Sequence, residues 1–353
     1  MFQNTFKMAL FCTLGMFIID ENRYPASSNR PNDYDIIGGA GLYALIGARI
    51  VAGEKRSKSV CAIIDKGSDF PHQVERELLA WNTGTIFRED KTRLTSRGAN
   101  IYDEQGIRHF EYLAPKKRIE AKDIIANDYL LHSKCFHLIC SVDRCKELVE
   151  SIRANTTGNP IFIYEPLPDD CVFENFDKLL QLLPQIDIFT PNLNEACLLV
   201  GETELPETEE GLGKIASKFS RYLSKPKSGL VLRCGALGCY VDAEGTSQLY
   251  PAYHQDQSKV IDVTGGGNLF CGGFAVAYVL TGDWQTAAIC GNIVSGCIIE
   301  RLGMPKMGLE NECGRGDGET WNETSFEERL RIYGEKNPAL SLGDLPLLLS
   351  SKQ

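Results

Sequence analysis

Three consecutive glycines stand near the beginning of the stretch from Asp262 to Ala275, which reads DVTGGGNLFCGGFA. An apolar run with helical spacing follows, so Gly265, Gly266 and Gly267 lie at the start of a predicted helix. Glycine permits positive φ and lets backbone N–H groups approach a ligand, and a helix N-terminus carries about half a positive charge. The stretch therefore predicts a site for phosphate or another anion. A glycine-rich turn that only begins a buried helix is the alternative.

A second polar cluster, Thr190-Pro191-Asn192-Leu193-Asn194-Glu195, directly follows a predicted strand over residues 186–190. Asn192 and Glu195 are therefore expected at the carboxyl edge of a sheet, where α/β proteins bind ligands. A carboxylate there can orient the water shell of Mg²⁺. The same residues fit a helix N-cap, with Asn192 as the cap and Glu195 at the third helical position. The two roles are compatible.

Two further glycine pairs are weaker signals. Residues 39–44 read GAGLYA and fit the dinucleotide-binding pattern G-x-G-x-x-A, with Asp65 about the right distance downstream for a ribose-binding acid. That fold needs a strand running directly into the glycines, but only Ile36-Ile37 precede them after a polar stretch, which disfavours it. Gly235 and Gly238 lie between two predicted strands and, taken alone, predict a hairpin turn.

The cysteine and basic residues give weaker evidence for a functional site. The chain has 13 cysteines without regular spacing, which predicts free thiols in a reducing compartment. Cys135, His137, Cys140 and Cys145 fit no usual zinc spacing, and a buried strand is the preferred interpretation. The run Lys116-Lys117-Arg118 predicts a solvated face, with a phosphate contact as the alternative.

Composition indicates the class of protein in which these motifs occur. The chain has 353 residues, 43% of them hydrophobic and 24% charged, which is typical of a globular protein with one large α/β core or two domains. A net charge of −10 argues against a general nucleic-acid surface. Met8 to Ile19 is apolar but lacks a signal-peptide cleavage site and is too short to span a bilayer. We expect residues 9–19 to form one buried strand with Asp20 at its carboxyl end, and we expect no membrane interaction.

Predicted strands and helices alternate along most of the chain. Strands are predicted over residues 60–64, 136–141, 160–164, 186–190 and 230–234, and helices over residues 42–51, 73–81, 144–152, 173–183, 195–200 and 209–223. This alternation predicts βαβ units, and hence a mostly parallel sheet with helices on both faces. Residues 92–113 look instead like a hairpin insertion, which could cover a site together with residues 21–35. Ser325 opens a capping-box pattern for one last helix to about Tyr333.

Taken in order, four of these motifs resemble the PfkB family of ribokinase-like carbohydrate kinases over about residues 8–305. They are Gly38-Gly39-Ala40-Gly41, Asn192-x-x-Glu195, Gly235-x-x-Gly238 and Asp262 to Gly273. Three further stretches resemble the fungal maintenance-of-killer (Mak) branch of that family: Phe11 to Asp20, Thr95 to Gly98 and Tyr112 to Arg118.

The resemblance implies a three-layer α/β sandwich over residues 1–305, with small β lid segments near 21–37 and 92–115, followed by a C-terminal loop, helix and tail over 306–353. It implies transfer of the γ-phosphate of ATP, with Mg²⁺, to a hydroxyl of a sugar or nucleoside. We expect a cytoplasmic protein, with the nucleus as an alternative, and no direct nucleic-acid partner. Lids pair in some members, so a homodimer through the lid stays open. Members of the Mak branch are implicated in stabilising double-stranded-RNA virus particles.

The resemblance also assigns roles to individual positions. Residues matched to substrate binding are Asp20, Gly39, Gly41 and Tyr43. Residues matched to the nucleotide or its metal are Asn192, Glu195 (Mg²⁺ through water), Gly235, Gly238, Asp262, Thr264 and Asn292, the last close to the adenine. Gly265, Gly266 and Gly267 match the anion hole. Tyr43 stands where the sugar-binding asparagine is usual, so a ribose-like pocket does not follow from the resemblance.

Asn268 stands where the family has its catalytic aspartate. In the family that carboxylate accepts the proton of the attacking hydroxyl; an amide can position the hydroxyl but has no basic oxygen. General-base catalysis contributes about 10²–10⁴-fold, whereas phosphoryl transfer depends mostly on positioning and charge stabilisation. The sequence therefore predicts a slow kinase. The alternative is a catalytically inactive pseudo-kinase that binds nucleotide or sugar, or serves as an interaction protein.

Overall fold

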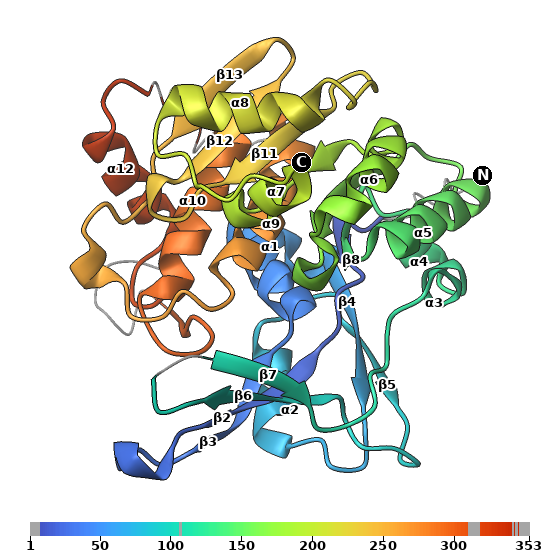
Figure 1. Cartoon of the computed structure of the whole chain (residues 1–353). Helices are drawn as coiled ribbons and strands as arrows, with labels where there is room; N and C mark the ends of the chain where they lie inside the picture. The colour runs from blue at the N-terminus through green and yellow to red at the C-terminus, as the bar shows by residue number, and fades with distance from the viewer. Residues whose placement is uncertain (1–7, 106–107, 310–317, 341, 343–344, 346–353) are drawn as a thin grey trace.

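The structure is a computed structural model that describes residues 8–105, 108–309, 318–340, 342 and 345 (Figure 1). Nine strands form one large sheet in the order β13-β12-β11-β10-β9-β8-β1-β4-β5. The strands from β11 to β5 are parallel, whereas β12 pairs antiparallel with β11 and β13 pairs antiparallel with β12. Their bounds are β1 Phe11–Thr13, β4 Val60–Lys66, β5 Ile86–Glu89, β8 Cys135–Cys140, β9 Ile161–Pro166, β10 Ile188–Phe189, β11 Gly229–Arg233, β12 Cys239–Ala243 and β13 Thr246–Tyr250.

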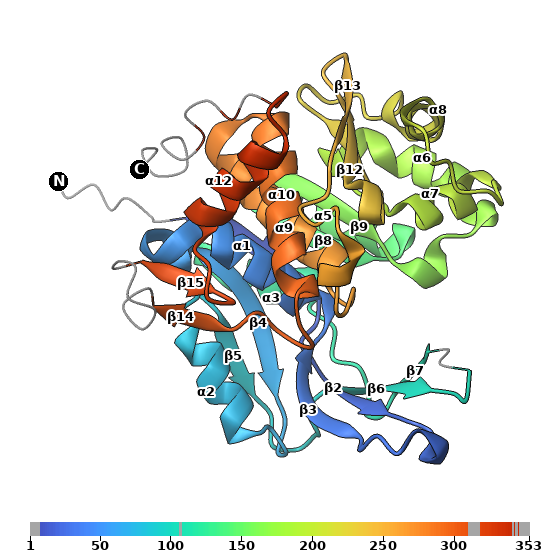
Figure 2. The same cartoon turned by 90° about the vertical axis from the view of Figure 1, so that its left-hand side faces the viewer.

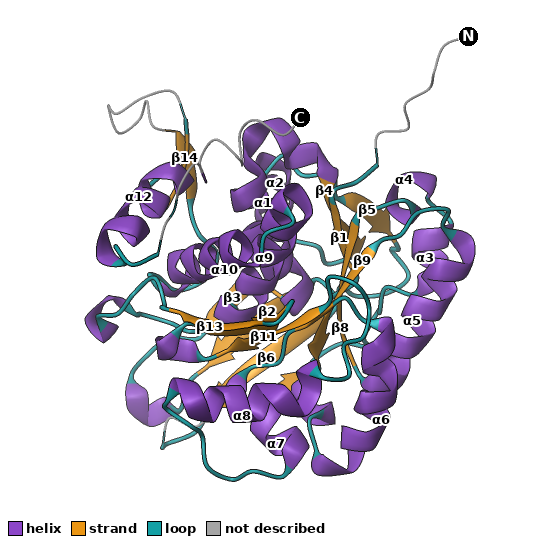
Figure 3. Cartoon of the chain, turned by 90° about the horizontal axis from the view of Figure 1, so that it is seen from above, coloured by secondary structure: helices purple, strands orange, loops and turns teal. Residues whose placement is uncertain are grey.

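Helices cover both faces of this sheet (Figure 3). One buried apolar cluster joins the sheet to α1, α9 and α10, and a second joins its other face to α5, α6, α7 and α8. The helix bounds are α1 Ala40–Arg56, α2 His72–Ala80, α3 Ala121–Ile125, α4 Asp128–Leu131, α5 Val142–Asn155, α6 Phe176–Leu182, α7 Leu193–Val200, α8 Glu209–Ser220, α9 Gly266–Thr281, α10 Trp284–Ile299 and α12 Phe326–Lys336. The predicted α/β sandwich around a mostly parallel sheet is confirmed.

A second sheet of four strands, in the order β3-β2-β6-β7, projects from one end of the sandwich (Figure 2). Its strands are β2 Ile18–Arg23, β3 Asp33–Gly38, β6 Arg97–Tyr102 and β7 Arg108–Tyr112. It overlaps the two segments expected to form a lid. Thr92 to Thr95, which also carry β-forming residues, belong to no strand.

The expected single strand over residues 9–19 is wrong. β1 ends at Thr13 in the large sheet, and β2 begins at Ile18 in the smaller one. The chain turns between them because the Gly15 N–H donates to the Thr13 hydroxyl at 3.1 Å, and because Gly15 packs directly on the backbone of Gly41. A side chain at either glycine would overlap the other residue. Asp20 therefore lies on the smaller sheet rather than at the end of a central strand.

The alternative dinucleotide-binding interpretation of residues 39–44 is also excluded. Ile36 and Ile37 lie in β3, which pairs antiparallel with β2, so no parallel central strand runs into the glycines. Asp65, the proposed ribose-binding acid, is engaged by Arg88 through two hydrogen bonds of 2.8 and 2.7 Å.

The C-terminal segment packs on the sandwich through α12 and a two-stranded sheet of β14 (Met307–Leu309) and β15 (Glu319–Trp321). The Ser325 side chain caps α12 by accepting from the Glu328 N–H at 3.3 Å, as predicted. Parts of the predicted C-terminal loop and tail within 306–353 lie outside the described residues. In the described part of the chain, none of the helices has the length and apolar character needed to cross a membrane.

Candidate functional site

A cleft of about 800 Å³ opens between the carboxyl edge of the large sheet and the four-stranded sheet. Most residues predicted to form the site line it: Asp20, Gly39, Tyr43, Asn192, Glu195, Gly235, Gly238, Asp262, Thr264, Gly265, Gly267, Asn268 and Asn292. Gly41 and Gly266 are not among its lining residues. Gly41 packs against Gly15, and the side Gly266 would use for a Cβ faces Ile299 and Ser295. The basic run over 116–118 lines a separate hollow.

The glycine turn lies at the mouth of α9. Gly265 has φ 79°, and a Cβ at this position would overlap the ring of Tyr43, so both conformation and space require glycine. The turn before it is fixed by the Thr264 N–H, which donates to Asp262 Oδ1 at 3.0 Å. The first turn of α9 contains no acidic residue, so its N–H groups and helix dipole are not neutralised from within the helix. This arrangement suits an anion.

Asn192 and Glu195 form a reciprocal cap at the start of α7. Asn192 Oδ1 accepts from the Glu195 N–H, and Glu195 Oε2 accepts from the Asn192 N–H, both at 2.8 Å. Arg233 Nη2 donates to the same Oε2 at 3.3 Å. Burial raises the pKa of Glu195, and the Arg233 charge opposes that rise. Both contacts to the Glu195 carboxylate use Oε2, and this carboxylate lines the cleft, so its ligand chemistry fits water-mediated binding of Mg²⁺.

A buried network that the sequence did not predict connects this cap to residue 268. Glu165, in β9, accepts at Oε1 from Arg233 Nη1 at 2.7 Å and from Asn268 Nδ2 at 2.9 Å. Its Oε2 accepts from His137 Nε2 at 3.0 Å, and His137 Nδ1 lies 3.0 Å from the Thr13 hydroxyl. A carboxylate only accepts hydrogen bonds, so Nδ2 is the atom of Asn268 that faces it.

The charge on Glu165 is strongly stabilised. Burial alone would raise its pKa, but Arg233, His137 and Asn268 together lower that pKa to about 2. A carboxyl group with so low a pKa is a poor proton acceptor near neutral pH. Glu165 lines the cleft beside Asn268 but is poorly suited to accept a proton there. The opposite case is Cys271, where burial holds the thiol pKa well above its ordinary value.

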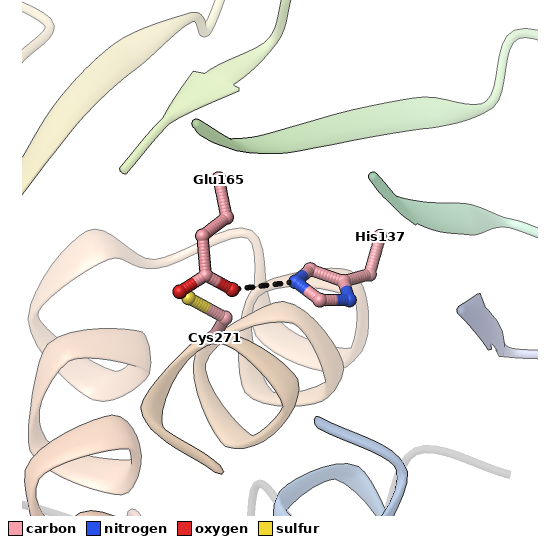
Figure 4. Close-up of side chains that lie close together, drawn as sticks. All are labelled: His137, Glu165 and Cys271. Atoms are coloured by element: carbon pink, nitrogen blue, oxygen red, sulfur yellow. Dashed lines mark hydrogen bonds and ion pairs between the residues drawn. The ribbon is translucent and has the colours of Figure 1, made fainter. Parts of the chain in front are cut away.

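His137, Glu165 and Cys271 converge within 4.8 Å, a combination of ligand types that could hold a metal ion (Figure 4). However, both oxygens of Glu165 already accept hydrogen bonds, and the Arg233 guanidinium lies 2.7 Å from one of them. A cation would face that positive charge at close range. We therefore assign the cluster as a hydrogen-bonded network and not as a metal centre. Cys135, Cys140 and Cys145 are buried free thiols.

At the opposite end of the cleft, Asp20 lies between two strands whose glycines make room for it. A Cβ at Gly38 would overlap its Oδ2, and a Cβ at Gly98 would lie 3.1 Å from its Oδ1. Two aromatic residues of the smaller sheet, Tyr102 and Phe110, also line the cleft. A carboxylate flanked by aromatic rings suits a polyhydroxylated ligand that also carries apolar surface.

Residues of the C-terminal segment stabilise the side of the cleft that is predicted to bind adenine. Asn292 Nδ2 donates to the carbonyls of Tyr250 and Pro251 at 3.0 and 3.1 Å, and the Tyr333 hydroxyl of α12 donates to Pro251 at 2.7 Å. Gly238 has φ 101°, and a Cβ there would overlap the Tyr250 carbonyl. These contacts fix the segment after β13 where it borders the cleft.

A second ion network lies behind that segment. Glu300 accepts two hydrogen bonds from Arg329 of α12, at 2.6 and 2.7 Å, and one from His254 Nε2 at 3.0 Å. Burial would raise the pKa of Glu300, but His254 and Arg329 lower it to about 2. His254, for which the sequence suggested no partner, therefore connects the cleft lining to α12.

Glu165 and Arg233 were not predicted as site residues, although the sequence contains a signal for both. Glu165 follows the apolar run over 160–164, and Arg233 lies near the end of the run over 230–234. Polar residues at the ends of predicted parallel strands point to the same sheet edge as Asn192. Applying that rule to every predicted strand would have brought both residues to the site.

Comparison with known proteins shows similarity to carbohydrate and nucleoside kinases. The model of the pfkB family of carbohydrate kinases matches residues 90–308. The chain is 37% identical to Protein MAK32 of Saccharomyces cerevisiae over 348 residues, which cover 94% of this chain and 93% of that protein. Its fold resembles adenosine kinase of Anopheles gambiae (TM-score 0.65, 16% identity, 84% and 97% of the two chains) and ribokinase of Thermotoga maritima (TM-score 0.61, 17% identity, 93% and 100%).

Proposed function

Since this chain belongs to the pfkB family of carbohydrate kinases, with relatives that include a yeast Mak protein, we propose that it transfers the γ-phosphate of ATP to a hydroxyl of a sugar or nucleoside, and does so slowly. Kinase-type chemistry is supported by the family and the fold. The slow rate is supported by one observation, the hydrogen bond from Asn268 to Glu165.

The cleft offers a place for each reactant. The triphosphate would be bound by the backbone N–H groups of Gly265 and Gly267 at the N-terminus of α9, since the Gly266 N–H donates to the Val263 carbonyl at 3.2 Å. Glu195 would hold Mg²⁺ through water, and the ion would neutralise phosphate charge when bound. Asp20 would accept hydrogen bonds from substrate hydroxyls, and the adenine would lie near Asn292.

Asn268 would position the attacking hydroxyl without taking its proton. Because Nδ2 is committed to Glu165, the Oδ1 side of the same amide is left to accept a hydrogen bond from the substrate. The bond between the hydroxyl oxygen and the γ-phosphorus would form as the bond from that phosphorus to the β,γ-bridging oxygen breaks. ADP would leave with the electron pair, and the hydroxyl proton would pass to a phosphoryl oxygen and then to water. Such a route loses the rate contribution of a general base.

The alternative function is binding without turnover. A pseudo-kinase with this cleft would respond to nucleotide or sugar, or act as an interaction protein such as a stabiliser of viral particles. The same commitment of Asn268 to Glu165 favours it, because an amide at residue 268 cannot accept the proton of the substrate hydroxyl. We further propose that the protein is located in the cytoplasm or the nucleus. A homodimer formed through the four-stranded sheet is also part of this proposal.

A single-turnover assay separates the two functions. The protein in excess over γ-labelled ATP and Mg²⁺ is incubated with a panel of sugars and nucleosides, and labelled phosphomonoester is quantified. A slow kinase gives product with a subset of acceptors and none without acceptor. Nucleotide binding without product with any acceptor would support the pseudo-kinase instead. Failure to bind nucleotide would contradict the kinase and the nucleotide-binding pseudo-kinase, and would leave the interaction protein.

A further inference from the structure

Arg233 places a buried positive charge at the mouth of α9. It is the last residue of β11, is 8% exposed and lines the cleft. Its guanidinium lies so close to the glycine turn that a Cβ at Gly267 would overlap Nη1. Arg233 is therefore adjacent to the N–H groups proposed to bind phosphate, and it needs glycine at 267 to be there.

The guanidinium retains hydrogen-bonding capacity. Arginine has five N–H donors. Nη1 donates to Glu165 and Nη2 donates to Glu195, whereas Nε is buried and has no acceptor among the described residues. A buried donor without an acceptor is unfavourable, so a ligand that supplies acceptors near this group would be favoured.

The surrounding charges hold the arginine in place for such a ligand. Glu165 is fixed by His137 and Asn268, and Glu195 is fixed by the Asn192 N–H. Two carboxylates, one from β9 and one from α7, thus anchor one edge of the guanidinium. A planar, always charged and pre-positioned fork is well suited to phosphate oxygens.

We propose that Arg233 binds the terminal phosphate of the nucleoside triphosphate at the Gly265–Gly267 turn and stabilises the charge that develops on it during transfer. The inference rests on the proposed function. Phosphoryl transfer spreads negative charge over the equatorial oxygens, and an arginine supplied from within the chain can stabilise it. This electrostatic contribution would partly offset the loss of a base at residue 268, where only the position of the hydroxyl is controlled.

Nucleotide binding tests this role independently of turnover. Wild type and Arg233→Lys are titrated by calorimetry with Mg²⁺ and either a non-hydrolysable ATP analogue or ADP. Lysine keeps the charge but cannot bridge both carboxylates and a phosphate, so we expect affinity for the triphosphate to fall about tenfold or more while affinity for ADP changes less than about twofold. Equal losses for both nucleotides, or no loss for either, would overturn the proposal.

Two further variants guard against a folding effect. Arg49→Lys alters another fully buried arginine, paired with Glu319 away from the cleft, and should leave the triphosphate-to-diphosphate ratio unchanged. Arg233→Met combined with Glu165→Gln removes one charge of each sign and should lower the ratio as Arg233→Lys does. If neither Arg233 variant folds, Arg233 is a structural counter-ion and the proposal is wrong. If wild type binds neither nucleotide, the proposed function itself fails.

Discussion

The carboxamide of Asn268 donates to the carboxylate of Glu165 across 2.9 Å, so an aspartate at 268 would place two carboxylates side by side. Residue 268 is therefore the hydrogen-bond donor and residue 165 the acceptor, because only the amide carries N–H groups. Restoring the family base at 268 removes a donor from a buried acceptor. Any substitution at this position must be interpreted through that contact.

Asn268→Asp is expected to raise the phosphoryl-transfer rate, but by less than the about 10²–10⁴-fold of an undisturbed general base. The neighbouring Glu165 charge would raise the pKa of the new carboxyl group and disfavour its ionised form. Asn268→Asp combined with Glu165→Gln restores a donor facing an acceptor and should be faster than the single variant. Single-turnover rates give the comparison. Asn268→Ala is the control, and an equal rate for alanine and aspartate would exclude residue 268 as the base position.

Gly265→Ala should abolish nucleotide binding and lower stability. The residue has φ 79°, and a Cβ would overlap the Tyr43 ring. Gly245→Ala is the matched control because Gly245 has φ 76° and nothing within 4 Å of its Cβ position. Both variants should lose about 1–2 kcal/mol from backbone strain, and Gly265→Ala a further 1–3 kcal/mol or so from steric overlap. Chemical denaturation and calorimetry with ATP measure the two effects. Equal losses at both sites would contradict the tight fit on Tyr43.

The pH dependence of stability should report on Glu165. Its pKa falls from an ordinary 4.5 to about 2 in the folded protein, so its contribution is fully present above pH 4.5 and is lost as pH falls towards about 2. Glu165→Gln should therefore reduce the slope of unfolding free energy between those values by about 1.4 kcal/mol per pH unit. Glu300, with a pKa of about 2, provides a comparison: Glu300→Gln should flatten the same region. An unchanged slope in Glu165→Gln would contradict the network.

Arg329→Met should weaken, from a distance, the side of the cleft proposed to bind adenine. Its loss leaves Glu300 buried without its arginine and releases α12 from the segment that carries His254. We expect a loss of about 3–5 kcal/mol in unfolding free energy and weaker ATP binding. Arg331→Met, on the same helix but in exposed pairs with Glu328 and Glu335, should have little effect. If the two variants lose the same unfolding free energy, the contact between Arg329 and Glu300 does not hold the segment that carries His254.

Local sequence patterns predicted most of the α/β sandwich because each signal was short-range. Alternating apolar strands and helices, and the caps at Asn192 and Ser325, are encoded within a few residues. The break between β1 and β2 is not encoded locally. The residues on either side of it are apolar, and its cause is a contact between Gly15 and the distant Gly41. β5, β13 and α10 were not predicted either.

The glycine turn and the cap at α7 were found from motifs, whereas the network that joins them was not. Glu165, His137 and Arg233 come from β9, β8 and β11, and only the strand order brings them to one place. That order is fixed by packing between elements far apart in the chain. The sequence could therefore identify residue 268 from the family resemblance and place Glu165 at the same sheet edge, but it could not predict the hydrogen bond between them.

Calorimetric titration of the wild-type protein with ATP and Mg²⁺ tests most directly whether the glycine turn is a nucleotide site. We predict saturable binding of one nucleotide per chain, lost in Gly265→Ala and retained in Gly245→Ala. An absence of binding at millimolar ATP, or equal binding by the wild type and Gly265→Ala, would contradict a nucleotide site at the mouth of α9.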